Sequence, residues 1–379
     1  MLQRSIKIEE IKTIVVKVGT RLLTYKTGKL NLGIIEKLVR ELADFKNQGK
    51  EIILVSSGAV GAGIGKLGLK KKPVSTPEKQ AAAAVGQGLL IQIYEKLFAE
   101  YGHVVAQVLL TRDDIENRGR YINSRNTLLQ LFRYGAIPII NENDTISTEE
   151  IEFGDNDRLS ALVSTLVDAD LLIILTDIDG LYTANPQLDP TAQFIPLVEE
   201  ISPALKSAAG TTVEMMAKGG MVTKLQAAEI AMSAGINMVI ADGYQENILK
   251  RILSGEVAGT FFCAPEGHLT SRKRWIAFAQ KVKGTLTVDD GAEKALKILG
   301  KSLLPIGITL VRGEFNRGEA VSIFSTQGGE IARGLVNYSS QELCRIMGCR
   351  SVEIAGILGY SGEEEVVHRD NLVLCGYTM

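Results

Sequence analysis

The fold is decided by a short apolar stretch near the N-terminus, IKTIVVKVGT at residues 11–20. Its β-branched run predicts a buried strand over residues 11–18. Lys17 interrupts that run just before a glycine, and a buried lysine is costly without an anionic partner. Ligands of open α/β sheets sit beyond the carboxyl ends of the strands, so Lys17 is placed to hold a phosphate. The alternative is a strand-end lysine that reaches solvent, and this stretch alone does not decide between the two.

Strand and helix signals alternate from this stretch to about residue 260. Short apolar runs predict further strands at residues 51–55, 103–110, 136–141, 170–176 and 236–241. Helical spacing of apolar residues predicts helices at 32–45, 76–100, 121–134, 157–167 and 221–234. Apolar strands separated by helices indicate an α/β fold, an open mostly parallel sheet sandwiched by helices.

The composition of the sequence and the length of its predicted elements change near residue 262. Residues 263–280 are polar and basic in part and are predicted to be a linker. Beyond them, short strand signals at 284–288, 308–311, 320–324 and 330–336 are separated by glycine turns, which is typical of a small β-barrel.

Composition narrows the class of protein. The 379 residues carry a formal net charge of -2, which does not favour nucleic acid or anionic lipid as a partner of the whole molecule. The four cysteines and three histidines show no zinc spacing and no disulfide framework, so we predict no metal site built by the protein. There is no signal peptide and no apolar segment long enough to span a bilayer, so we expect a cytoplasmic protein without a membrane partner.

The second predicted strand runs into a glycine-rich loop, SSGAVGAG at residues 56–63. Small residues let backbone N–H groups approach an anion closely, and a following helix N-terminus adds a favourable dipole. Two other glycine patterns resemble known nucleotide-binding motifs but do not meet their requirements. Gly61–Lys66 resembles a P-loop, but Leu67 stands where Ser or Thr must bind magnesium. Gly63–Gly68 fits G-x-G-x-x-G, but it lies too far past the strand and no acid follows at the expected offset.

Polar clusters follow other predicted strands. NEND at residues 141–144 and GDND at 154–157 bring carboxylates and amides together, which suits an ammonium group or a cation, although Asn and Asp also form ordinary turns and caps. TDIDGLY at 176–182 predicts a nucleotide-binding edge. KGGMVTK at 218–224 places Lys224 in the first turn of a helix, where the dipole disfavours a cation unless an anion binds there too.

These motifs, in this order and over nearly the whole chain, resemble those of the amino acid kinase family with a C-terminal PUA domain. The resemblance rests on VVKVGT (15–20), SSGAVGAG (56–63), INEND (140–144), GDND (154–157), TDIDGLYTANP (176–186) and GGMVTK (219–224). It implies a kinase domain at residues 1–262, the linker at 263–280 and a PUA domain at 281–370.

Among members of this family, the pair of INEND and GDND and the appended barrel point to those that act on free glutamate. The resemblance then implies transfer of the γ-phosphoryl group of ATP to the glutamate side-chain carboxylate, which gives glutamyl 5-phosphate for proline biosynthesis. A carboxylate is already ionised at pH 7, so alignment and charge neutralisation suffice and no general base is needed.

The resemblance also implies residue roles. Lys17 and Lys224 would neutralise the transferring group and Asp157 would orient them, while Ser57, Asp144 and Asn156 would hold glutamate. The ATP site would comprise Lys17, Gly19, Gly58, Thr176, Asp177, Lys218, Gly219, Gly220, Met221, Val222, Thr223 and Lys224. Mg²⁺ would bridge phosphate oxygens with few protein ligands. This chain has Ala217-Lys218 where the family usually has Gly-Thr, and Lys218 is predicted to add a third cation.

Feedback inhibition by proline, a homotetramer and coupling to glutamyl phosphate reductase follow from the resemblance alone. RNA binding is not expected, because residues 281–379 carry 11 Lys and Arg against 12 Asp and Glu. Two alternatives remain open. One is the same fold acting on acetylglutamate or UMP. Asp144 is evidence against it, because a carboxylate is the expected partner of a free ammonium group. The other is an RNA-binding protein that has lost kinase activity.

Overall fold

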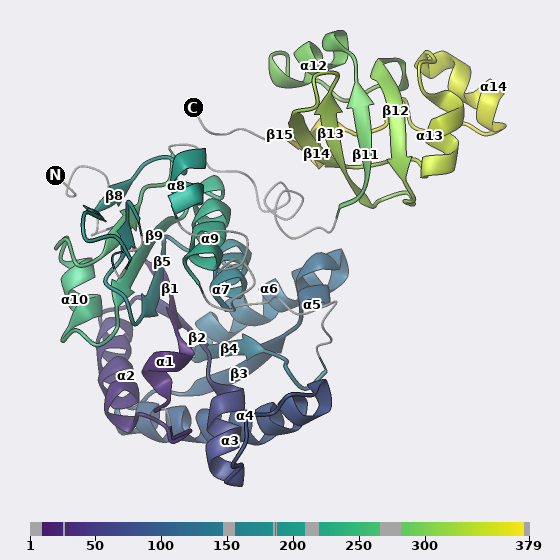
Figure 1. The fold of residues 1–379 in the computed structure, drawn as a ribbon. Helices are drawn as coiled ribbons and strands as arrows, with labels where there is room; N and C mark the ends of the chain where they lie inside the picture. The colour runs from purple at the N-terminus through teal and green to yellow at the C-terminus, as the bar shows by residue number, and fades with distance from the viewer. Residues whose placement is uncertain are drawn as a thin grey trace. The chain divides into compact units, whose positions relative to one another are not determined.

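The structure of the chain is a computed structural model, which describes residues 10–25, 27–146, 156–184, 186, 188–208, 220–265 and 282–374. The chain divides into two compact units, Met1–His268 and Leu269–Met379 (Figure 1). This division falls inside the predicted linker, of which residues 266–280 lie outside the described ranges. The domain boundaries stay predictions.

The first unit is built on an eight-stranded sheet in the order β3-β4-β2-β1-β5-β9-β10-β8 (Figure 1). Strand β1 lies near its middle, parallel to β2 on one side and β5 on the other. The antiparallel exception is β10 beside β9, so the predicted open and mostly parallel sheet is confirmed. The strands are β1 Thr13–Val18, β2 Glu51–Ser56, β3 Val105–Leu110, β4 Ile137–Glu142, β5 Leu171–Thr176, β8 Leu197–Val198, β9 Asn237–Asp242 and β10 Thr260–Phe262, with a separate hairpin of β6 Leu181–Tyr182 and β7 Phe194–Ile195.

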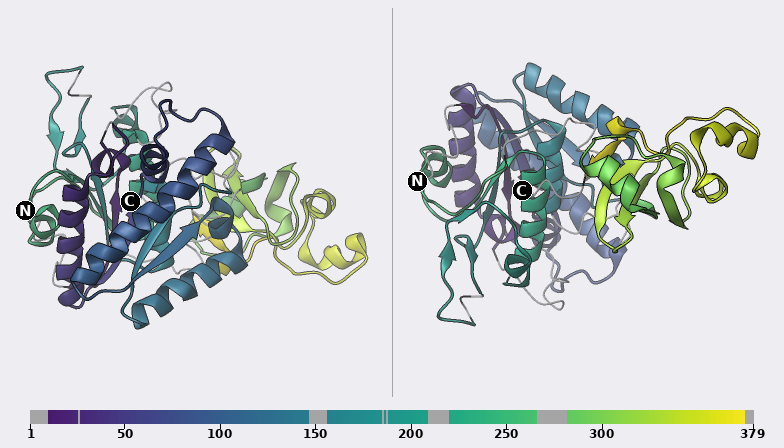
Figure 2. Two further views of the ribbon diagram at one scale, coloured as in Figure 1. Left: turned by 90° about the horizontal axis from the view of Figure 1, so that it is seen from below. Right: turned by 90° about the horizontal axis from the view of Figure 1, so that it is seen from above.

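Helices cover both faces of this sheet (Figure 2). Residues of α2, α4 and α10 share one hydrophobic cluster with Ile14, Val16 and Val18 of β1. Helix α7 lies against β1, β2, β4 and β5 and also contacts α9. The helices of this unit are α1 Thr20–Leu23, α2 Leu32–Asn47, α3 Ala59–Leu67, α4 Thr76–Glu100, α5 Arg112–Glu116, α6 Arg118–Arg133, α7 Asn156–Leu166, α8 Pro203–Ala208, α9 Met221–Ser233 and α10 Ile248–Leu253.

Helix α4 begins at Thr76, as its sequence predicts. Ser75 caps the helix and Pro77 occupies its first turn. The Glu78 carboxylate returns to accept hydrogen bonds from the Ser75 and Val74 amides, each at 3.0 Å. This capping box satisfies backbone donors that the first turn would otherwise leave without partners.

The second unit has its own hydrophobic core around a five-stranded sheet in the order β12-β11-β13-β14-β15. The predicted short strands are confirmed, but pairing is absent between the outer strands β12 and β15 within residues 282–374, so the described strands form an open sheet. Its elements are β11 Val282–Val288, α12 Asp290–Lys297, β12 Ile308–Gly313, β13 Ala320–Ser325, β14 Glu330–Leu335, α13 Ser340–Ile346, α14 Ile354–Leu358 and β15 Leu372–Leu374, with short 3₁₀ turns at Pro305–Gly307, Ser351–Glu353 and Arg369–Asn371.

Within the described ranges, none of the helices combines the length and the apolar character that crossing a membrane requires.

Candidate active site

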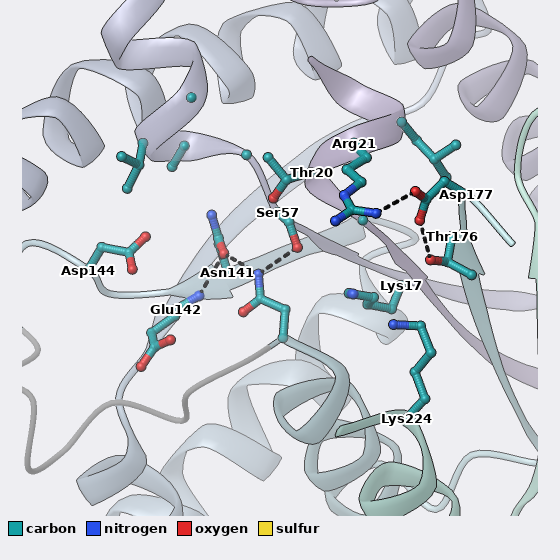
Figure 3. Close-up of a pocket in the computed structure, with 17 residues that line it drawn as sticks. Lys17, Thr20, Arg21, Ser57, Asn141, Glu142, Asp144, Thr176, Asp177 and Lys224 are labelled. Atoms are coloured by element: carbon teal, nitrogen blue, oxygen red, sulfur yellow. Dashed lines mark hydrogen bonds and ion pairs between the residues drawn. The ribbon is translucent and has the colours of Figure 1, made fainter. Parts of the chain in front are cut away.

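The carboxyl ends of β1, β2, β4 and β5 open into one cavity of about 440 Å³ (Figure 3). Parallel strands end on the same edge of a sheet, and loops at that edge usually carry the ligand site of an open α/β fold. The lining residues are Lys17, Gly19, Thr20, Arg21, Leu22, Ser57, Gly58, Ala59, Val60, Gly61, Asn141, Glu142, Asp144, Asn156, Thr176, Asp177 and Lys224. Segments more than 200 residues apart in sequence thus meet in one place.

Two lysines converge on one buried carboxylate at this site. Lys17 at the end of β1 forms an ion pair with Asp157 Oδ1. Lys224 in the first turn of α9 reaches Asp157 Oδ2 at 3.1 Å. Asp157 is fully buried at the start of α7, and the two lysines are only 4% and 3% exposed. The carboxylate therefore fixes the two ammonium groups relative to each other.

The electrostatics of Asp157 follow from these contacts. Burial alone would raise the pKa of its carboxyl group, because it disfavours the charged form. The charges and hydrogen bonds of Lys17 and Lys224 outweigh burial and lower that pKa to about 2. Asp157 is therefore ionised at neutral pH. Thr223 adds a hydroxyl group at 3.0 Å from Asp157 Oδ2.

A hydrogen-bonded cluster around Asn156 forms the middle of the cavity. The Asn156 amide nitrogen donates to the Ser56 carbonyl oxygen at 3.0 Å and to Asn141 Oδ1 at 2.8 Å, and lies 3.0 Å from Ser57 Oγ. A carbonyl oxygen can only accept, so these contacts fix which way the Asn156 amide faces. Its Oδ1 is buried and accepts no hydrogen bond from the described residues. A ligand with an N–H donor would satisfy it.

The two ends of the cavity differ in charge. Figure 3 shows Lys17 and Lys224 at one end and Asp144 at the other, with Ser57 and Asn141 between them. Glu142 also lines the cavity near the Asp144 end. The cavity thus suits a ligand that carries a cation at one end and anions at the other.

The glycine-rich loop turns directly into helix α3. Gly58 adopts φ +92°, a left-handed conformation that favours glycine, and α3 begins at the next residue. Backbone N–H groups in the first turn of a helix have no intrahelical partner, so this loop can offer them to an anion. Gly19 is different, since its N–H donates to the Leu175 carbonyl oxygen at 3.1 Å. The Gly19 amide thus has a backbone partner in this structure, and the place of Gly19 in the ATP site stays a prediction.

The end of β5 carries the residues predicted for the nucleotide. Thr176 and Asp177 both line the cavity. Asp177 forms an ion pair with Arg21 of α1 at 2.7 Å, and Thr176 donates to its carboxylate at 3.2 Å. Burial alone would raise the pKa of the Asp177 carboxyl group. The Arg21 guanidinium and these hydrogen bonds outweigh burial and lower that pKa. No sequence pattern indicates this pair, whose members lie 156 residues apart.

The structure brings together most of the predicted site residues, whose roles stay predictions. Lys17, Gly19, Ser57, Gly58, Asp144, Asn156, Thr176, Asp177 and Lys224 line the cavity, and Asp157 lies beside the two lysines. Gly220, Met221 and Val222 begin α9 but are not among the lining residues. Lys218 and Gly219 lie outside the described residues. Asn141 and Glu142 were not predicted as ligands, although both belong to the NEND cluster.

Among the described residues, no group of three or more His, Cys, Asp or Glu side chains is arranged to hold a metal ion. The acids near the two lysines and at the end of β5 are instead engaged with cations, Asp157 with Lys17 and Lys224 and Asp177 with Arg21.

Comparison with known proteins assigns this fold and site to a class. The sequence model of the amino acid kinase family matches residues 12–242, and that of the PUA domain matches residues 284–358. The chain therefore belongs to the amino acid kinase family and carries a PUA domain, as its motifs predict.

Its similarity to particular members is high over nearly the full length. It is 56% identical over 361 residues to the glutamate 5-kinase of Caldanaerobacter subterraneus subsp. tengcongensis, which covers 95% of this chain and 97% of that relative. It is 54% identical over 369 residues to the glutamate 5-kinase of Moorella thermoacetica, covering 97% of this chain and 98% of that relative. Among solved structures, a UMP kinase from Bacillus anthracis covers 68% of this chain and 98% of its own length, at 14% identity and a TM-score of 0.45.

Proposed function

We propose that this chain transfers the γ-phosphoryl group of ATP to the side-chain carboxylate of L-glutamate. The product is L-glutamyl 5-phosphate, and the reaction is the first step of proline biosynthesis. The observation that carries the proposal is the polarity of the cavity, with Lys17 and Lys224 held on Asp157 at one end and Asp144 at the other. The glutamate 5-kinases to which the chain is similar support it.

Glutamate fits this polarity in one orientation. Its α-ammonium group would pair with the Asp144 carboxylate and donate to the buried Asn156 Oδ1. Its side-chain carboxylate would then extend toward Lys17 and Lys224, with Ser57 beside it. An acetylated amine lacks the positive charge, so it would not pair with the Asp144 carboxylate. The site therefore favours the free amino acid over N-acetylglutamate.

The chemistry needs positioning more than proton transfer. The glutamate carboxylate is ionised at neutral pH and can attack the γ-phosphorus directly, forming a new P–O bond as the bond to the bridging oxygen of ADP breaks. Lys17 and Lys224 would neutralise charge on the transferring group, and Asp157 would keep both ammonium groups in place. Amides at the start of α3 would bind phosphate oxygens opposite the lysines.

ATP would occupy the end of the cavity formed by Thr176, Asp177 and the start of α9. Lys218 and Gly219, outside the described residues, remain predicted nucleotide contacts. Mg²⁺ would be bound mainly by the phosphate oxygens of ATP, because the described acids at this end are engaged with cations. When bound, the metal would neutralise phosphate charge.

A hydroxamate assay tests the proposal. The full-length protein is incubated with Mg²⁺, ATP and hydroxylamine, which traps acyl phosphates, and with glutamate, aspartate or N-acetylglutamate. We expect hydroxamate with glutamate alone. Asp144→Asn should raise the KM for glutamate by about tenfold or more, since the charge pair with the ammonium group is lost. Hydroxamate from N-acetylglutamate but not from glutamate would contradict the assignment.

Regulation and assembly are proposed on resemblance. Proline shares the α-carboxylate and ammonium of glutamate, so it would compete for the Asp144 end of the cavity and raise the KM for glutamate. A homotetramer and coupling to glutamyl phosphate reductase are the corresponding expectations for assembly. Steady-state kinetics with proline and sedimentation of the purified chain test the first two, and co-purification with the reductase tests the third.

A further inference from the structure

Helix α4 carries two buried polar side chains that the proposed chemistry does not use. Gln87 is 7% exposed and Tyr94 is 1% exposed. They lie seven residues apart, so both project from the same face of the helix. The other buried residues of that face are Ala82, Ala83, Gly86, Leu90 and Phe98. A buried amide and a buried hydroxyl need hydrogen-bond partners, and those partners show where each side chain acts.

Tyr94 reaches the end of strand β2. Its hydroxyl oxygen lies 3.0 Å from Ser56 Oγ, and Ser56 Oγ in turn donates to the Ser57 carbonyl oxygen at 3.2 Å. If the Tyr94 hydroxyl donates to Ser56 Oγ, the hydroxyl protons of both Tyr94 and Ser56 form hydrogen bonds. Burial raises the pKa of Tyr94 well above its ordinary range, which keeps the phenol protonated and able to donate.

This relay constrains the glycine loop through the geometry of one peptide bond. In a trans peptide, the C=O of Ser57 and the N–H of Gly58 point in opposite directions. The Ser57 carbonyl oxygen accepts from Ser56 Oγ, which lies against Tyr94 of α4. The Gly58 N–H therefore points away from α4. Gly58 lines the cavity, and its φ of +92° continues the turn into α3. Tyr94 thereby acts on the phosphate end without touching a substrate.

Gln87 reaches the end of the neighbouring strand β4. Its Nε2 donates to the Glu142 carbonyl oxygen at 3.2 Å. The Glu142 N–H donates to Asn141 Oδ1 at 2.9 Å, and the same oxygen accepts from Asn156. Gln87 thus holds the backbone two residues before Asp144. Its contact lies at the end of the cavity proposed for the ammonium group.

We propose that Gln87 and Tyr94 are positioning residues through which α4 aligns the two ends of the active site separately. Tyr94 orients the Gly58 amide toward the phosphoryl group in transfer, and Gln87 holds the end of β4 that presents Asp144 to the amino acid. The inference rests on the proposed function, because it assigns phosphate and ammonium to these two ends.

Two substitutions test the inference, one expected to change kcat and the other expected to change the KM for glutamate. Tyr94→Phe removes only the hydroxyl group and should lower kcat about tenfold with the KM for glutamate changed less than about twofold, because a misdirected donor weakens transition-state binding. Gln87→Met keeps the side-chain length but cannot donate, and should raise the KM for glutamate about tenfold with kcat nearly unchanged. Gln87→Asn, whose amide is too short to reach Glu142, is a second variant should Gln87→Met fold poorly.

Matched controls and a double variant distinguish positioning from stability. Gln92→Met and Tyr101→Phe make the same chemical changes at more exposed positions, Gln92 within α4 and Tyr101 just after it. Both variants should leave kcat and the KM for glutamate unchanged. Ser56→Ala combined with Tyr94→Phe should be no slower than Tyr94→Phe alone, since both break one relay.

Each outcome bears on the inference. Variants that lose only thermal stability, or that change kcat and KM alike at both positions, overturn it while an active wild-type protein leaves the proposed function standing. A wild-type protein without activity on glutamate overturns both.

Discussion

The carboxylate of Asp157 sets the spacing of the two lysines. Without it, the two ammonium groups would lose the carboxylate that they share in a buried site. Its lowered pKa means that the native state holds the charged form more strongly than the unfolded chain does. The same residue thus contributes to stability beside its proposed role in catalysis, and the two roles can be separated by pH.

Asp157→Asn should destabilise the protein by about 3 kcal/mol or more near pH 7, because it leaves buried cations without their shared partner. The stabilisation by Asp157 is complete above its unfolded pKa of 3.8 and declines as the pH falls toward the folded value of about 2. The gap in unfolding free energy between wild type and variant should thus shrink by about 1 kcal/mol between pH 6 and pH 3. Urea denaturation at several pH values measures it, with Asp44→Asn on the exposed face of α2 as the control. A gap independent of pH would contradict the assignment.

Lys224→Met should lower kcat by about a thousandfold, as the loss of a cation at a transferring phosphoryl group does in other kinases. Lys206→Met is the matched control. Lys206 also pairs with an acid, Glu229 of α9, but is well exposed, so its loss should leave kcat unchanged. Rates measured at saturating ATP and glutamate compare the two. Equal effects at both positions would show that Lys224 acts through helix α9 rather than on the phosphoryl group.

At the scale of elements, the packing of α3 on α4 sets the position of the glycine-rich loop. A Cβ on Gly86 would lie 1.7 Å from the Ala59 carbonyl oxygen, and one on Gly63 would lie 1.8 Å from the Ala82 carbonyl oxygen. The two helices are therefore in backbone contact where α3 begins. Any side chain between them must displace the turn that contains Gly58.

Gly86→Ala should destabilise the protein by about 1–3 kcal/mol through overpacking and should lower kcat, since α3 must shift. Gly88→Ala on the same helix meets nothing within 4 Å and should instead stabilise by about 0.5–1 kcal/mol with kcat unchanged. Thermal unfolding and the hydroxamate assay measure both effects. A Gly86→Ala protein as stable and active as wild type would mean that α3 can move without cost.

The same elements show what the sequence could and could not predict. Strands β4 and β5 are buried at every position and are mostly apolar in sequence, so they were predicted nearly to the residue. Helix α3 contains Gly61, Gly63 and Gly65, which in sequence indicate a loop. Gly63 and Gly65 are glycines within the helix because α4 and Gly28 approach too closely for a side chain, whereas a Cβ on Gly61 would come no closer than 3.4 Å to Thr24. Such contacts, like Arg21 with Asp177 or Tyr94 with Ser56, depend on tertiary packing that no local pattern encodes.

At the scale of the whole molecule, the chain combines a kinase unit with a PUA unit of nearly balanced charge. Binding to RNA gains most of its affinity from Lys and Arg contacts to phosphates. We therefore expect no retardation of a hairpin RNA by micromolar protein at about 0.15 M salt in a gel-shift assay. A basic RNA-binding protein serves as the positive control. Retention of the RNA at that salt would give the PUA unit a role separate from the kinase.

The central claim is that the side-chain carboxylate of free glutamate attacks ATP. The most direct test uses glutamate with ¹⁸O in that carboxylate and follows the released phosphate by ³¹P NMR. Attack places one labelled oxygen between carbon and phosphorus, and cyclisation of the product by its own amine expels phosphate with that oxygen attached. The account predicts one ¹⁸O atom in each phosphate formed in the presence of glutamate. Phosphate without label would show that water, not glutamate, accepts the phosphoryl group, and would contradict it.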